Sequence, residues 1–79
     1  MELELRNKQG VLFAKYKGGA AECQLVGLHS SVNTFKPTTK SFVNDPKTYI
    51  VFVCIDYCKF MITDDIEIQF EPGDYVKVK

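Results

Sequence analysis

Short runs of alternating apolar and polar residues, separated by turn-forming residues, are the main pattern of this chain. Leu3 and Leu5 alternate with charged residues, and the alternation returns over 11–17 after the turn-forming sequence 7–10. A period of two is typical of a strand with one buried face. The pattern therefore predicts strands over 2–6 and 11–17. A third strand is expected over 21–25, after a two-residue hairpin turn at Gly18-Gly19.

The segment 28–47 interrupts this alternation with Ser, Thr and Pro residues and two isolated phenylalanines. A structureless loop of that length is uncommon inside a compact domain. Three structures fit the segment: a binding loop or lid, a mobile segment, or an irregular strand. In the last case, 31–35 forms a short edge strand and Phe42 fills the core. Pro37 and Pro46 lack a backbone donor, so neither lies in a central strand.

The stretch 49–62 is rich in Val, Ile, Phe and Tyr and is apolar on both faces of a strand. Either it is a central strand covered on both sides, or one face meets another subunit. Asp56 and Lys59 mark a bend where one long strand becomes two. At that bend Asp56 is exposed or paired with Lys59; a buried Asp56 would instead need a partner or a raised pKa.

The C-terminal region predicts a hairpin. Residues 63–65 form a turn, 66–70 alternate cleanly, and Glu71-Pro72-Gly73-Asp74 suits a type II turn before a last strand over 75–79. The whole chain, 1–79, is expected to form a single domain, because its size allows only one core. The predicted fold is all-β: a small, strongly bent antiparallel sheet or partly open barrel of the SH3-like or OB-like kind, with about six short strands and one long loop.

The three cysteines do not resemble a secreted disulfide framework. Along one strand, Cys54 and Cys58 would lie about 13 Å apart, too far to be bridged. A set formed by Cys23, His29, Cys54 and Cys58 lacks the spacing of a metal knuckle, so no metal is predicted and the cysteines are expected in the core. With no signal peptide and no spanning segment, we expect a cytoplasmic protein without membrane contact.

Catalytic chemistry is not supported by the residues present. The chain has one histidine, His29, and no glycine-rich loop of the phosphate-binding type. No Ser or Cys has an obvious neighbouring base, which leaves a distant pairing of His29 with Cys23 or an acid as the enzyme alternative. We therefore expect no enzyme, no cofactor and no small-molecule substrate.

Charge adds one further feature. Ten basic and ten acidic residues balance, which argues against a protein that coats duplex nucleic acid. Residues 1–40 contain six basic and three acidic residues, whereas 41–79 contain four and seven. Either the two halves pair across the sheet, or the surface is dipolar. A dipolar surface steers a charged partner or favours head-to-tail self-association.

These observations favour a non-enzymatic protein-interaction module of the inhibitor, adaptor or accessory-subunit type, a class that includes virus-encoded proteins. It would bind a protein partner or assemble with itself. The alternative is a small β-barrel that binds single-stranded nucleic acid, with Phe13, Lys15 and Lys17 on one face of a strand and Lys36 and Lys40 beside it. The candidate residues for protein contact are Phe35, Lys36, Lys40, Phe42, Tyr49 and Tyr57.

Overall fold

The computed structural model describes residues 1–61 and 65–79, which form a mostly β fold. Five strands make an antiparallel sheet in the order β2-β1-β7-β4-β3, and β5 pairs with β6 in a second, smaller sheet. The prediction of a small all-β fold is confirmed. The elements are β1 (Glu2–Arg6), β2 (Leu12–Lys17), α1 (Gly19–Ser30), β3 (Phe35–Ser41), β4 (Thr48–Cys54), β5 (Cys58–Met61), β6 (Glu67–Phe70) and β7 (Tyr75–Val78).

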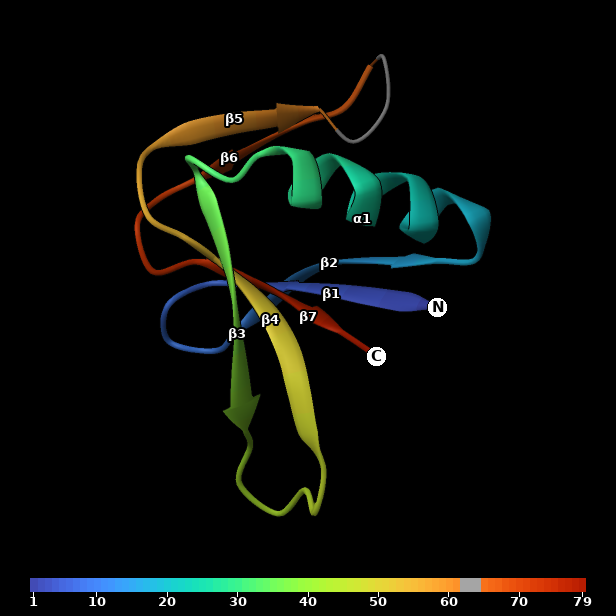
Figure 1. The fold of residues 1–79 in the computed structure, drawn as a ribbon, viewed down its shortest axis with the longest axis vertical. Helices are drawn as coiled ribbons and strands as arrows, with labels where there is room; N and C mark the ends of the chain where they lie inside the picture. The colour runs from blue at the N-terminus through green and yellow to red at the C-terminus, as the bar shows by residue number, and fades with distance from the viewer. Residues whose placement is uncertain (62–64) are drawn as a thin grey trace.

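The hydrophobic core lies on one face of the five-stranded sheet. The helix and the β5–β6 sheet both lie on that side (Figure 1). No helix or strand of the described part of the chain lies over the opposite face of the sheet. No helix formed by the described residues combines the length and apolar character needed to cross a membrane. The buried side chains of the core cluster are Leu3, Leu5, Ala21, Leu28, Phe35, Phe52, Cys54, Phe70 and Val76.

The predicted strand over 21–25 is wrong, because this segment lies within α1. The preceding hairpin turn is wrong as well: Gly18 has φ of +69° and leads directly from β2 into the helix. Ala21, Leu25 and Leu28 share one side of the helix at spacings of four and three residues, and they pack against the core. The strand interpretation used the period of two over five residues and missed this longer spacing.

The segment 28–47 contains a regular strand. After α1 ends, Ser31 accepts backbone hydrogen bonds from Thr34 and Phe35 through its carbonyl oxygen, so 31–34 is a turn rather than an edge strand. The strand β3 begins at Phe35, where the predicted edge strand would have ended. It lies at the edge of the sheet, which is where Pro37 is tolerated.

The bend in 49–62 is confirmed. The first part, β4, belongs to the large sheet, and β5 begins after a three-residue connection and belongs to the small one. Asp56 lies in that connection and is exposed, as expected for a bend. Val51 and Phe52 point to opposite faces of β4 and both are buried, although among the described residues no helix or strand lies over the Val51 side. Ile62 and the predicted turn residues 63 and 64 lie outside the described residues.

Two turns form as predicted, but one of them joins strands that do not pair. Gly10 closes the β1–β2 turn by donating to the carbonyl of Asn7. Asp74 donates to the carbonyl of Glu71, and Gly73 has φ of +98°. The predicted hairpin of 66–70 with 75–79 is nevertheless wrong, because β6 pairs with β5 while β7 lies between β1 and β4.

Candidate binding face

The uncovered face of the large sheet gathers most of the basic side chains of the chain. Because side chains alternate along a strand, the register places Glu4, Lys15 and Lys77 on one face, opposite to Leu5 and Val76. By the same alternation, every second residue of the neighbouring strands lies on this face. Lys79, which follows directly after β7, belongs to it as well. We call this surface the basic face; its charged members are Glu2, Glu4, Arg6, Lys15, Lys17, Lys36, Lys40, Lys77 and Lys79.

The basic face has an excess of positive charge. It holds seven of the ten basic residues, against Glu2 and Glu4 and a third carboxylate, Asp45, at its rim. The formal charge of the face is therefore about +4. Because the chain as a whole is neutral, the remaining residues carry about −4, with three basic and seven acidic residues. The sheet separates the two signs of charge in space, whereas the two halves of the sequence separate them only in part.

Glu4 organises the centre of this face. Its side chain is buried and accepts hydrogen bonds from Arg6 at 2.9 and 3.1 Å and from Lys79 at 3.3 Å, while the Lys77 ammonium lies 4.0 Å away. Burial alone raises the pKa of Glu4. The hydrogen bonds and charges of Arg6 and Lys79 outweigh burial, so the pKa of this carboxyl is lowered.

A cluster of lysines and aromatic rings lies beside Glu4. The Lys77 ammonium is 3.9 Å from the ring centre of Phe42 and 4.2 Å from that of Tyr49. The Lys40 ammonium lies 4.5 Å from the ring centre of Tyr75. These distances are within the range of cation–π attraction. The rings thus stabilise the lysines and are themselves covered, since Tyr75 is buried and Phe42 and Tyr49 are half-buried.

Two lysines of the face remain available to a partner. Lys36 and Lys40 are exposed on the edge strand β3, and no carboxylate among the described residues forms an ion pair with either. Lys15 and Lys17, on the other edge strand, share Glu2 with Lys79 at 3.4 to 3.9 Å. The unshared positive charge is therefore concentrated along β3.

The structure brings four of the six residues predicted for protein contact onto this face: Lys36, Lys40, Phe42 and Tyr49. Phe35 is buried in the core with its ring against Phe60 and Phe70, and Tyr57 is exposed on the connection between β4 and β5. Sequence reasoning missed Glu4, Arg6, Tyr75, Lys77 and Lys79. The sequence pattern that could have identified them is the alternation in β1 and β7, which places the polar residues of each strand together on one face.

The alternative set for nucleic acid is divided by an irregularity in β2. The register shifts between Leu5 and Arg6, which pair with Ala14 and Leu12 and leave Phe13 as the extra residue of a bulge. The Phe13 ring turns toward Phe70, with the ring centres 6.0 Å apart. Lys15 and Lys17 lie on the basic face, so the structure does not join Phe13 to them in a stacking platform.

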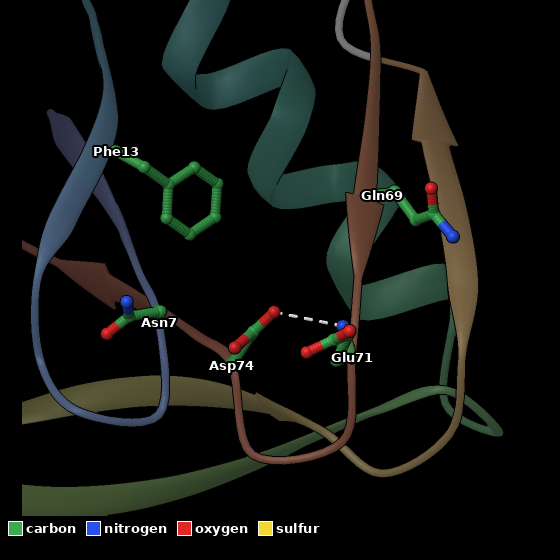
Figure 2. Close-up of a pocket in the computed structure, with 5 residues that line it drawn as sticks. All are labelled: Asn7, Phe13, Gln69, Glu71 and Asp74. Carbon is green, nitrogen blue, oxygen red and sulfur yellow. Dashed lines mark hydrogen bonds between the residues drawn. The ribbon is translucent and has the colours of Figure 1, made fainter.

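An open pocket of about 360 Å³ is lined by Asn7, Phe13, Gln69, Glu71 and Asp74 (Figure 2). Its polar groups hold turns. The Asp74 carboxylate accepts the backbone N–H groups of Lys8 and Glu71, and the Asn7 side-chain oxygen accepts those of Gln9 and Val11. These contacts satisfy the polar atoms of the turns, and the pocket presents no nucleophile with a base.

The expected core position is confirmed for Cys54, with Cys58 packed against the core, but the expected spacing of these two residues and the expected position of Cys23 are wrong. Because β4 ends at Cys54, the chain turns and the thiols of Cys54 and Cys58 come close enough to interact, so the 13 Å separation does not hold. Cys54 is buried and Cys58 is half-buried, whereas Cys23 is exposed on α1 and not in the core. His29 lies in the last turn of α1 with its ring 4.8 Å from that of Phe52. Within the described part of the chain, no three His, Cys, Asp or Glu residues form a group suited to a metal ion.

Comparison of the chain with protein-family models, with curated proteins and with solved structures found no match.

Proposed function

We propose that this chain is a non-enzymatic interaction module, of the inhibitor, adaptor or accessory-subunit type, that binds an acidic protein surface through its basic face. The observation that supports the proposal is that seven of the ten basic residues lie on the sheet face over which residues 1–61 and 65–79 place no other element. Complementary charge raises the rate and specificity of such association more than its final affinity. The three thiols are free, which suits a reducing cytoplasmic location.

A protein partner fits this face better than a nucleic acid. Stacking of bases requires exposed aromatic rings, but Tyr75 is buried, and Phe42 and Tyr49 are half-buried and engaged by lysines. Glu2 and Glu4 also lie on this face, on β1, and carboxylates are unfavourable next to phosphates. A protein surface of mixed charge tolerates two carboxylates that a regular phosphate backbone does not.

Single-stranded nucleic acid is the second candidate, favoured by the position of four lysines. Lys15 and Lys17 lie on one outer strand, and Lys36 and Lys40 lie on the other. A single-stranded nucleic acid lying across the sheet would therefore meet positive charge at both edges. Binding of this kind falls steeply as salt rises, because counterions are released from the phosphates.

The test compares two labelled probes by fluorescence anisotropy: a glutamate-rich peptide and an oligothymidylate of similar length. The double variant Lys36→Glu/Lys40→Glu should bind the peptide at least about tenfold more weakly, because it reverses two positive charges that no carboxylate neutralises. Lys59→Glu is the matched control, since Lys59 is exposed on β5 and away from the face. Equal affinity of the double variant and the control would refute the proposal. Tighter binding of the oligothymidylate would favour the second candidate.

A further inference from the structure

We infer that the acidic protein surface taken by the basic face is the opposite pole of a second copy of this chain, in a head-to-tail arrangement. The inference rests on the proposed function and names its partner. It starts from the exposed charges that the described residues place outside the basic face, where five carboxylates stand against three lysines, a balance opposite in sign to that of the face; the carboxylates are Glu22, Asp56, Asp65, Glu67 and Glu71.

Several of these described acidic residues lie on, or directly next to, the elements that cover the core side of the sheet. Glu67 is exposed on β6, Glu71 follows it in the turn, and Glu22 is in the first turn of α1. Figure 1 shows α1, β5 and β6 together on one side of the large sheet, opposite to the basic face. We call this side the acidic pole. The two poles are thus presented in opposite directions.

Exposed apolar side chains accompany both surfaces. Tyr57 is 69% exposed and Met61 is 50% exposed near the acidic residues. At the tip of the β3–β4 hairpin, next to Phe42 of the cation–π cluster, Val43 is 92% exposed. Apolar contact of this kind adds affinity to an association that charge orients.

The expected complex is weak and open-ended. The molecule measures 36 × 27 × 21 Å, so one pole offers roughly 500 Å² of contact per partner, at the low end of interface sizes. When one face binds a different face of the next copy, the contact is heterologous. Such contacts build an open chain of copies unless the rotation between successive copies closes a ring. The association should therefore depend strongly on concentration and salt.

The first measurement is mass by multi-angle light scattering over a range of protein concentrations. At low ionic strength, the average mass should rise above the monomer mass of 9.0 kDa as concentration increases. At about 0.5 M salt it should return to the monomer value, because exposed charges are screened. A monomer at every concentration at low salt would overturn the inference, as would association that salt does not change.

The decisive measurement uses two complementary variants. Lys36→Glu with Lys40→Glu disables the basic face, and Glu67→Lys with Glu71→Lys disables the acidic pole. Each variant alone should be monomeric, but a mixture retains one functional surface from each and should form a one-to-one dimer of twice the monomer mass. Thermal melting by circular dichroism checks that both variants fold. A mixture of folded variants that stays monomeric would overturn the inference. The proposed function would still stand if the wild-type chain binds the glutamate-rich peptide.

Discussion

At the scale of single residues, Glu4 links the stability of the sheet to its surface charge. The sequence places it as an ordinary polar residue of a half-buried strand. In the structure it is buried and shared by three cations. Removing the carboxylate from such a buried, hydrogen-bonded group would leave the charges of the three cations uncompensated.

We expect Glu4→Gln to lower the free energy of unfolding by about 2 kcal/mol at pH 7, the size of a charged hydrogen bond lost from a protected site. The folded pKa of Glu4 is lowered from 4.5, so its contribution is complete above that value and is lost as pH falls through the folded pKa. The difference between wild type and variant should thus shrink toward pH 3. Urea unfolding at both pH values measures it. Glu2→Gln is the control: Glu2 is more exposed, and its loss should cost less than about 1 kcal/mol. A pH-independent difference would contradict this role for Glu4.

The cysteines give a second prediction at this scale. Burial, with the neighbouring Cys54, raises the pKa of Cys58 to about 11, and burial also raises the pKa of Cys54. At pH 8 only about one Cys58 thiol in a thousand is the reactive thiolate. Iodoacetamide should therefore modify the exposed Cys23 first, and Cys58 about a hundredfold more slowly. Mass spectrometry of peptides over time measures the order. Fast labelling of Cys58 in the folded protein would show that the site is open.

At the scale of elements, the contact between α1 and β5 depends on one glycine. A methyl group at Gly27 would lie 2.9 Å from the ring of Phe60, closer than carbon atoms normally approach. The Phe60 ring is held in place by Phe35 and Phe70. A glycine inside a helix is unfavourable by itself, so the close approach of β5 explains its presence.

Gly27→Ala is expected to destabilise the protein by about 1 kcal/mol, because overpacking against Phe60 exceeds the gain in helix propensity. In a Phe60→Leu background the clash is relieved, and the same change should become neutral or stabilising. Gly19→Ala, in the first turn of the same helix, is the control, because an added methyl there would meet no atom within 4 Å outside the neighbouring residues and the local helix backbone. Chemical denaturation of the four proteins of the cycle measures the coupling. Additive effects would contradict a direct contact.

The same elements show what the sequence could predict. The strands β1 and β2 and the turn at Asn7 were predictable because alternation and turn residues agree locally. The helix was not, because Glu22 and Gln24 alternate with apolar neighbours and imitate a strand over five positions. The final hairpin failed for a different reason. Its turn is local, but the pairing of β7 with β1 and β4 is decided by distant segments that compete for its edges.

At the scale of the whole molecule, the candidate site was only partly predictable. Lys36, Lys40, Phe42 and Tyr49 were singled out from a segment expected to be a loop, and the structure unites them on one face. Their meeting with Lys77 and Lys79 depends on the strand order, which no local pattern contains. The charge asymmetry was visible in the sequence, but its axis follows the two faces of the sheet and not the two halves of the chain.

The separation of positive and negative charge between the two sides of the sheet predicts how self-association responds to acid. The acidic pole draws its charge from exposed carboxylates such as Glu67 and Glu71. Strong acid protonates carboxylates while ammonium groups stay charged, so at low pH every copy becomes cationic and the copies repel one another. Light scattering at low ionic strength should therefore show association near pH 7 and monomers near pH 3.5, with circular dichroism confirming that the fold persists. Raising the pH from 7 to 9 should change little, because exposed ammonium and carboxylate groups in general keep their charge over that interval. Association that grew stronger in acid would mean that apolar contacts, and not the two charged poles, hold the copies together.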